Sequence, residues 1–518
     1  MSLDRDQLLA AFHAAVASCD PSTRVRDGMR AAQVATLVAD RRRFGVAIGK
    51  AALAMARGAG PVERGVIVIP ATRDALAVGA DAVRDEAVSD AADAAVRDGV
   101  RDGATHEGDE VARSARGTFD FADIPAGWRV VASAHPFVDE RGVLAAKAAR
   151  EVVDAASEGD VVIALISGGA SALIEEPIEG VSIDELGAIT RAVMEAGASI
   201  AELNDVRSTL SRVKRGGLVA RCVAPVVTLA ISDVIGDGLA TIGSGPTIGA
   251  WFVDDEDARR ERARRVVERS TLLGRERAVA IASAIERAST RDRENARAPI
   301  SQSEGPTDTR GRDIALVVGR MADFAQAAFG ALGPRTWLEY VTEPLQGDVV
   351  SCAKRLVDLV GIDQGVGVDQ GVGIDQGVGG IGGVGSVGPS DATVHGTYVA
   401  WGEPTLRVPA DHGEGGRAQQ LALELAKALR GTNLVAMAIG SDGVDGPPPA
   451  GRAAPAGAIV DGTTWDAIVD AGHDPERALA RCDAGTVLDA VGALVVTGPT
   501  GINHGDLVVI GDRGLASS

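Results

Sequence analysis

Short runs of consecutive apolar residues recur along the chain and predict buried strands. Each run is rich in Val, Ile, Leu or Ala and spans four to six residues. Runs without polar alternation are typical of strands that are covered on both faces. The predicted strands are Phe44–Ile48, Val66–Ile69, Val130–Ser133, Val161–Ile166, Val226–Ile231, Ile314–Val318, Leu434–Ile439 and Leu494–Thr497.

Longer amphipathic stretches lie between these runs and predict helices. In them apolar residues return every three or four positions, which is the spacing of one helix face. The predicted helices include Ala51–Arg57, Val143–Ala156, Ile183–Ala196 and Arg417–Leu429. Strands that alternate with helices predict an α/β fold, in which helices cover both faces of a mostly parallel sheet.

Three segments interrupt this pattern and are expected to be insertions. Residues 78–118 contain no Leu, Ile, Met or aromatic residue and carry ten acidic against five basic side chains. Residues 290–312 have a similar character, and residues 361–390 hold the repeat GIDQGV-GVDQGV-GIDQGV within a Gly-rich stretch. Such compositions bury too little apolar surface to offset the entropy of ordering the chain, so we expect disordered or flexible loops.

The length of 518 residues suits more than one domain. We predict an N-terminal α/β domain over residues 1–253 and a C-terminal α/β domain over residues 312–518. The stretch Asp254–Glu268 is charged on nearly every face. We therefore expect residues 254–290 to form a charged helical connection between the two domains.

Charge and cysteine content exclude several classes of protein. The chain has 52 Lys+Arg against 72 Asp+Glu, a formal charge of -20, which disfavours binding to nucleic acid or to an anionic membrane. No apolar run is long enough to span a bilayer, and the first residues carry early acids without a basic flank, so we expect no signal peptide. The cysteines Cys19, Cys222, Cys352 and Cys482 are scattered and predict neither disulfides nor a metal knuckle. We expect a cytoplasmic protein with small-molecule partners, and a homo-oligomer is left open.

Only five of the 52 basic residues are Lys. An acidic chain almost devoid of Lys has the composition of cytosolic proteins from salt-loving organisms, in which salt screens the self-repulsion. A bias toward GC-rich codons gives the same excess of Arg, so both explanations stay open.

The loops that follow the predicted strands carry the candidate chemistry, because ligands of open α/β sheets bind beyond the carboxyl ends of the strands. Lys50 follows the first strand at a helix start, where a cation is unfavourable unless an anion binds there. Asp233 and Asp237 follow Val226–Ile231, and paired carboxylates suit Mg²⁺. The alternative reading for each residue is a solvated charge or a turn cap.

Small residues and further polar groups complete the candidate set. Small residues let successive backbone N–H groups approach phosphate oxygens, although a Gly pair by itself is more often a tight turn. The nucleotide- or substrate-binding candidates are Ser167, Gly168, Gly169, Ser171, Asn204, Arg207, Lys214, Gly243, Ser244, Gly245, Thr247, Gly415, Gly416, Asp442, Asp445 and Asn503. Arg417 joins them at a helix start. The histidines His13, His135, His412 and His504 have no evident partner and are interpreted as structural.

One dinucleotide-type motif, GVGGIG at residues 377–382, has the spacing GxGxxG. It lies in the Gly-rich insertion, follows no predicted strand and opens no predicted helix, which a dinucleotide site requires. The match is therefore interpreted as compositional.

Eight motifs occur in one order and together resemble the class II glycerate kinases, the glycerate 2-kinase family with a C-terminal MOFRL domain. They are FGVAIGKAALAMA, SAHPFVDERG, LISGGASAL, ELNDVRSTLSRVKRGGL, ISDVIGDGLATIGSGPT, GEGGRAQQLAL, GSDGVDGPPPAG and TGPTGINHGDL. The resemblance covers nearly all of the chain outside the three insertions. It implies two Rossmann-like α/β domains with mostly parallel sheets and an active-site cleft between them.

The resemblance also implies a reaction, the transfer of the γ-phosphoryl group of ATP to D-glycerate, usually giving 2-phosphoglycerate. The proposed catalytic Lys and Arg of the family fall on Lys50 and Arg417, and we expect these two cations to neutralise the phosphoryl group and the glycerate carboxylate. Asp233 would hold Mg²⁺ or accept the hydroxyl proton, and Asp237 is a second candidate ligand for the metal.

The sequence departs from the family at four places. Ala170 replaces a Gly of the loop, Arg215 replaces the Gly after the motif Lys, Gly238 replaces a common Asp, and residues 418–420 are Ala-Gln-Gln. Three alternatives stay open: a nicotinamide-dependent hydroxypyruvate reductase, a kinase of another sugar acid, and a noncatalytic protein that binds sugar acids or nucleotides.

Overall fold

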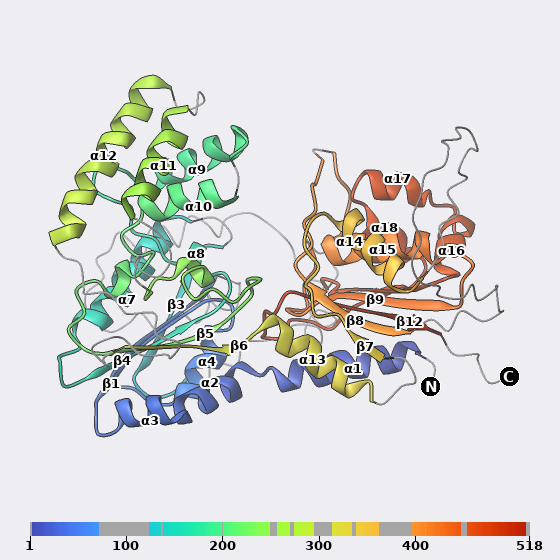
Figure 1. Ribbon diagram of the computed structural model, residues 1–518, viewed down its shortest axis with the longest axis horizontal. Helices are drawn as coiled ribbons and strands as arrows, with labels where there is room; N and C mark the ends of the chain where they lie inside the picture. The colour runs from blue at the N-terminus through green and yellow to red at the C-terminus, as the bar shows by residue number, and fades with distance from the viewer. Residues whose placement is uncertain are drawn as a thin grey trace, which may run out of the picture. The chain divides into compact units, whose positions relative to one another are not determined.

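The chain divides into two compact units. The computed structural model describes residues 3–71, 124–135, 138–198, 200–248, 256–269, 274–294, 313–333, 338–361, 396–409, 411–446 and 453–513. One unit, here called the parallel-sheet unit, comprises Val16–Phe324 and Gly498–Gly505; the other, called the mixed-sheet unit, comprises Met1–Ala15, Ala325–Thr497 and Asp506–Ser518. Figure 1 labels the elements of both.

The parallel-sheet unit has a Rossmann-like sheet. Its strands are β1 (Arg43–Ile48), β2 (Arg64–Pro70), β3 (Trp128–Ser133), β4 (Val161–Ile166), β5 (Val226–Ile231) and β6 (Ile314–Gly319). All pairings among them are parallel, in the order β3-β2-β1-β4-β5-β6. The strand order reverses between β1 and β4, which is where doubly wound sheets bind ligands. The predicted α/β class and parallel pairing are confirmed for this unit.

Helices cover both faces of this sheet, and β1, β2, β4 and β5 are therefore buried along nearly their whole length. On one face, α2 (Pro21–Arg30), α3 (Ala32–Val38) and α4 (Ala52–Ala59) bury Val25, Val34 and Met55 against the strands. On the other face, α7 (Glu140–Asp154) buries Ala145, Ala149 and Val152, and the short α8 (Ala170–Leu173) lies beside it.

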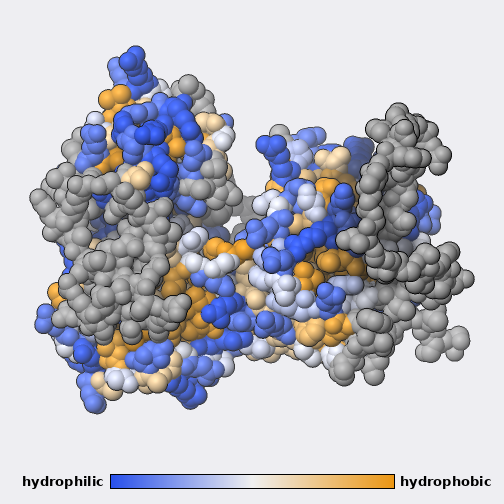
Figure 2. Space-filling model, in the orientation of Figure 1, coloured by the Kyte–Doolittle hydropathy of each residue, from blue (hydrophilic) through white to orange (hydrophobic). Residues whose placement is uncertain are grey.

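Residues 254–290 were predicted to connect two domains, but the helices described there belong to a cluster of four helices within one unit. The helices α11 (Glu256–Arg269) and α12 (Arg275–Glu294) pack with α9 (Ile183–Glu195) and α10 (Ile200–Thr209) inside the parallel-sheet unit. Ala263, Val266 and Val267 of α11 are buried in the shared core, so a narrow apolar stripe suffices on an otherwise charged helix. Figure 2 shows the hydrophilic side chains over this region.

The unit boundaries differ from the predicted domains at both ends. β6 pairs with β5, so the parallel-sheet unit extends to Phe324 rather than ending at residue 253. The N-terminal residues join the mixed-sheet unit, where Leu3 N donates a hydrogen bond of 2.9 Å to Asp512 O. Both differences follow from strand pairing between segments that are distant in the sequence.

The mixed-sheet unit pairs most of its strands antiparallel. Its strands are β7 (Leu338–Tyr340), β8 (Thr397–Gly402), β9 (Leu434–Gly440), β10 (Gly457–Asp461), β11 (Leu494–Val495) and β12 (Asp506–Asp512), in the order β11-β10-β9-β12-β8-β7. Among these described strands only β7 and β8 pair parallel. The expectation of a mostly parallel sheet is therefore wrong for this unit, because β9 pairs antiparallel with both β10 and β12, and β12 pairs antiparallel with β8.

Helices cover this sheet as well. The helices α14 (Val349–Leu359), α15 (Arg417–Ala428), α16 (Thr464–Asp470), α17 (Pro475–Ala480) and α18 (Ala484–Ala490) share one core with the sheet. On the opposite face lie α1 (Arg5–Ser18) and α13 (Met321–Ala331) (Figure 1). Among the helices of the described ranges, none has both the length and the apolar composition needed to cross a lipid bilayer.

The predicted insertions fall almost entirely on residues that the structure does not describe. Residues 78–118 lie outside the described ranges, as do residues 295–312 and 362–390. The short remainder, residues 290–294, ends helix α12.

Candidate functional site

Two loops meet where the order of the parallel sheet reverses. The loop after β1 carries Gly49 and Lys50, and the loop after β4 carries Ser167 and Gly168. Lys50 N donates to Gly168 O at 2.9 Å, and Ala51 N donates to Ser167 Oγ at 3.1 Å. Gly49 has a φ of +133°, and a Cβ atom built on it would lie 2.1 Å from Ser167 Oγ. The close packing of the two loops therefore requires glycine at position 49.

Asp233 and Asn503 join this loop pair from two further segments of the same unit. Asp233 lies just after β5, and Asn503 Nδ2 donates to Asp233 Oδ2 at 2.9 Å. A Cβ atom on Gly168 would lie 2.0 Å from Asp233 Oδ2 and 2.3 Å from Asn503 Nδ2. The absence of a side chain at Gly168 thus makes room for the carboxylate and the amide. Four predicted site residues, Ser167, Gly168, Asp233 and Asn503, are brought together here.

The second predicted metal ligand, Asp237, is engaged elsewhere. Its carboxylate forms an ion pair of 3.5 Å with Arg320 Nε, and its own φ is +51°. Within the described residues, no three His, Cys, Asp or Glu side chains converge as a metal site. A Mg²⁺ site with one protein carboxylate and several phosphate or water oxygens needs no such group. Asp233 could be the single protein carboxylate of such a site, whereas the Asp237 carboxylate is paired with Arg320.

A second small-residue loop packs on the start of α8. Gly243, Ser244 and Gly245 have φ values of +58°, +64° and +55°, so three successive residues are left-handed. Ser244 Oγ lies 2.8 Å from Ser171 Oγ, and a Cβ atom on Gly243 would lie 2.8 Å from Ala170 Cβ. The predicted residues of both Gly loops are therefore neighbours.

Thr247, Asn204 and Arg207 occupy less central places. Thr247 is buried, and its Oγ1 lies 2.9 Å from Thr228 Oγ1 on β5, so it joins the loop to the sheet. Asn204 is exposed on α10. Arg207, one turn further along α10, directs Nη2 toward Ser171 Oγ at 3.5 Å.

Lys214 is buried, unlike the other cations of the predicted set. Its Nζ donates to Ser171 O at 2.8 Å and forms an ion pair of 2.9 Å with Glu175. The two side chains are only 2% and 1% exposed. Burial lowers the pKa of Lys214, and the Glu175 charge opposes that shift. Lys214 thus supports the loop from inside the protein.

His135 lies beside Lys50, although sequence reasoning placed it among the structural residues. A Cβ atom on Gly169, whose φ is +85°, would lie 3.2 Å from His135 Nε2 and 3.4 Å from Lys50 Cγ. Burial and then the charge of Lys50 lower the pKa of His135, which favours a neutral imidazole. Its position two residues after β3 was the available signal, because Lys50, Ser167 and Asp233 also lie just after strands of this sheet.

His504 matches the structural interpretation. Its ring is fully buried and stacks on Phe324, with the two ring centroids 6.2 Å apart. Burial lowers the pKa of His504 to about 4. The ring is therefore neutral in the folded protein at neutral pH.

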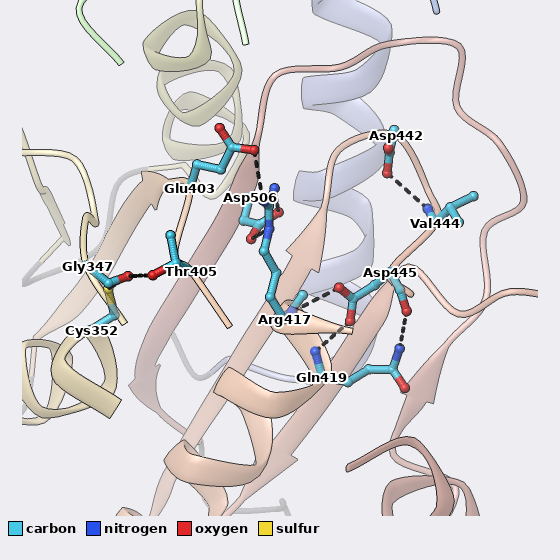
Figure 3. A network of polar contacts seen from close by, with 11 residues as sticks. Gly347, Cys352, Glu403, Thr405, Arg417, Gln419, Asp442, Val444, Asp445 and Asp506 are labelled. Atoms are coloured by element: carbon cyan, nitrogen blue, oxygen red, sulfur yellow. Dashed lines mark hydrogen bonds and ion pairs between the residues drawn. The ribbon is translucent and has the colours of Figure 1, made fainter. Parts of the chain in front are cut away.

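In the mixed-sheet unit, Arg417 begins α15 and contacts two carboxylates (Figure 3). Nε and Nη2 donate to Asp506 at 2.8 and 3.2 Å, and Nη1 donates to Glu403 at 2.8 Å. Burial raises the pKa of Asp506 to about 7 against the opposing charge of Arg417. Burial lowers the pKa of Arg417, but Asp506 and Glu403 outweigh this and hold it above its usual value.

Sequence reasoning missed both of these carboxylates. Glu403 directly follows β8, and Asp506 is the first residue of β12. Neither strand was among those predicted, so the residues next to them were not candidates. The signal was present in the apolar runs of both strands.

The remaining predicted residues of this unit shape the start of α15. Asp445 accepts hydrogen bonds from Ala418 N at 3.0 Å and Gln419 N at 2.7 Å, so it caps the helix. A Cβ atom on Gly416 would lie 2.3 Å from Asp445 Oδ1, and one on Gly415 would lie 2.8 Å from Gly485 N. Asp442 Oδ1 accepts from Val444 N at 3.1 Å in the same loop (Figure 3).

Comparisons with known proteins agree with this architecture. Residues 7–284 match a domain of unknown function, DUF4147, and residues 396–506 match the MOFRL family. D-glycerate 2-kinase of Thermotoga maritima is 32% identical over 74% of this chain and 79% of its own length. A putative hydroxypyruvate reductase of Agrobacterium vitis is 32% identical over 75% of this chain and 78% of its own. The crystal structure of glycerate kinase from Thermotoga maritima superposes with a TM-score of 0.66, at 25% identity, over 98% of this chain and 100% of the other.

The fold, the loops at the strand ends and these similarities define an α/β kinase that acts on an alcohol group of a small molecule. More narrowly, the chain belongs to the class II glycerate kinases, the MOFRL family. It is a glycerate kinase, as the resemblance of its motifs implied.

Proposed function

We propose that this glycerate kinase transfers the γ-phosphoryl group of ATP to the 2-hydroxyl of D-glycerate and releases 2-phosphoglycerate. The observation that best supports this proposal is the set of adjoining loops at the point where the strand order of the parallel sheet reverses. These loops carry Lys50, Gly168, Asp233 and Asn503. The name of the Thermotoga maritima relative, D-glycerate 2-kinase, supports the position that is phosphorylated.

The loops supply what phosphoryl transfer needs, which is positioning and neutralisation of charge. The left-handed run Gly243–Gly245 is fixed by hydrogen bonds from Ser244 N to Thr241 O and from Gly245 N to Ile242 O, and its small residues let phosphate oxygens approach the backbone closely. Lys50 brings a cation to the loop that holds Gly168 and Gly169. We assign the phosphate groups of the nucleotide to these loops and the transferring phosphoryl group to Lys50.

Asp233 has two compatible roles. Its carboxylate, oriented by the Asn503 amide, fits a single protein ligand for Mg²⁺. Bound with ATP, Mg²⁺ would neutralise charge on the phosphate oxygens. The same carboxylate also suits acceptance of the proton from the glycerate hydroxyl.

Arg417 is assigned to an anionic group of the substrates, the glycerate carboxylate or the phosphoryl group. A guanidinium binds carboxylates through two parallel hydrogen bonds, and its charge is independent of pH in the working range. Lys50 and Arg417 then both act in one reaction, and loss of either cation should abolish most of the activity.

The test is the release of ADP from ATP with D-glycerate, followed by NMR identification of the phosphorylated carbon. We expect Lys50→Met and Arg417→Met to lower kcat/KM at least about 100-fold, and Lys147→Met, an exposed lysine on α7, to have no effect. Activity near that of the wild type in Lys50→Met would refute the assignment. A panel of other sugar acids measures substrate range, and oxidation of NAD(P)H by hydroxypyruvate would indicate the reductase instead.

A further inference from the structure

Arg417 divides its donors between two carboxylates that differ sharply in burial. The side chain of Asp506 is 5% exposed, that of Glu403 is 44% exposed, and that of Arg417 is 32% exposed. Figure 3 shows the two carboxylates on different sides of the guanidinium. One partner is therefore enclosed by the protein, and the other reaches solvent.

Asp506 is held in place by the sheet. It lies in register with Gly402 of β8 on one side and with Gly440 of β9 on the other. A Cβ atom built on Gly440 would lie 3.7 Å from Asp506 Oδ1, so this glycine borders the carboxylate. The carboxylate receives both Nε and Nη2 of Arg417, and this two-point contact fixes the plane of the guanidinium.

Glu403 has the opposite character. It is the first residue after β8, and its Oε1 accepts a hydrogen bond of 2.8 Å from Arg417 Nη1. Solvent screens such an exposed pair, so it contributes little to stability and exchanges readily with another anion. An incoming carboxylate or phosphate finds the same donor, Nη1, at the solvent side of Arg417.

We propose that Glu403 is an exchangeable partner of Arg417, which an anionic group of the substrate replaces on Nη1, while Asp506 remains bound as the positioning residue. The proposal rests on the proposed function of Arg417 in binding a substrate anion. Glu403 keeps the guanidinium paired before the substrate arrives and selects for anions strong enough to displace a carboxylate. A neutral analogue of glycerate cannot replace the Glu403 carboxylate on Nη1, so we expect it to bind more weakly than glycerate.

The first test removes the charge of Glu403 and keeps its shape. We expect Glu403→Gln to lower the KM for D-glycerate, and the Kd measured by calorimetry, roughly two- to fivefold, because an exposed carboxylate no longer competes. Glu414→Gln is the matched control, since it removes one exposed negative charge three residues before Arg417. An unchanged or higher KM in Glu403→Gln, relative to Glu414→Gln, would overturn the exchange.

The second test separates positioning by Asp506 from a role in folding alone. We expect Asp506→Asn to lower kcat by roughly 100-fold with a smaller change in KM, and Glu403→Gln in the same background to give no further gain in affinity. An effect on thermal stability with unchanged kcat would show that Asp506 is only structural. If Arg417→Met itself keeps wild-type activity, the proposed function of Arg417 fails, whatever the Glu403 variants do.

Discussion

Lys214 allows a test of whether a predicted substrate contact is in fact a structural support. Its ammonium and the Glu175 carboxylate are almost completely buried and lie 2.9 Å apart. Lys214→Met leaves the carboxylate buried without its cation, which typically costs about 3–5 kcal/mol of the free energy of unfolding. Ser171 O also loses the hydrogen bond of 2.8 Å that Nζ donates to it. We expect a large loss of stability and a displaced α8 loop.

The double variant Lys214→Met/Glu175→Gln is the control. It removes the uncompensated charge, so we expect it to recover most of the stability and part of the activity that the single variant loses. Urea unfolding and kcat/KM at saturating ATP measure the two effects separately. A single variant that keeps its stability within about 1 kcal/mol but loses its activity would refute the supporting role and restore Lys214 as a substrate contact.

Three further predictions follow from individual positions. Gly168→Ala places a Cβ atom 2.0 Å from Asp233 Oδ2, and we expect kcat/KM to fall about 100-fold while the melting temperature shifts by only a few degrees. The folded His504 has a pKa of about 4 against an ordinary 6.5, so only the unfolded chain binds its proton between these values. Stability should therefore fall by about 3 kcal/mol as the pH drops from 6.5 to 4, and His504→Phe should flatten that slope in chemical unfolding. His135→Gln should weaken the acid limb of the pH–rate profile, since protonating the imidazole beside Lys50 sets two positive charges against each other and displaces the Lys50 ammonium; an unchanged profile would exclude that role.

The sequence predicted the parallel sheet well because its strands are apolar throughout. Val161–Ile166 and Val226–Ile231 are the bounds of β4 and β5 in the structure, and both strands are buried along their whole length. A strand that is covered on both faces has apolar residues at nearly every position, so its run is easy to recognise in the sequence. The loops after these strands were found for the same reason, and with them Ser167, Gly168 and Asp233.

The mixed sheet was harder to predict because its strands carry polar or Gly residues at their ends. β12 begins at Asp506 and ends at Asp512, and β8 ends at Gly402. Missing these strands hid Asp506 and Glu403, the two partners of Arg417. The burial of Lys214 was hidden in a different way, because it depends on Glu175, which is distant in the sequence and meets it only in the folded unit.

The hydrogen bond between Asn503 and Asp233 joins two residues that are 270 positions apart in the sequence. Residues 498–505 belong to the parallel-sheet unit, yet the chain enters and leaves them from the mixed-sheet unit. A gene cut after the codon for Phe324 would encode all six parallel strands and lack the amide that orients Asp233. During translation, the Asp233 carboxylate is made 270 residues before the Asn503 amide that binds it. The parallel-sheet unit therefore cannot be expressed as one continuous segment without losing the hydrogen bond from Asn503 to Asp233.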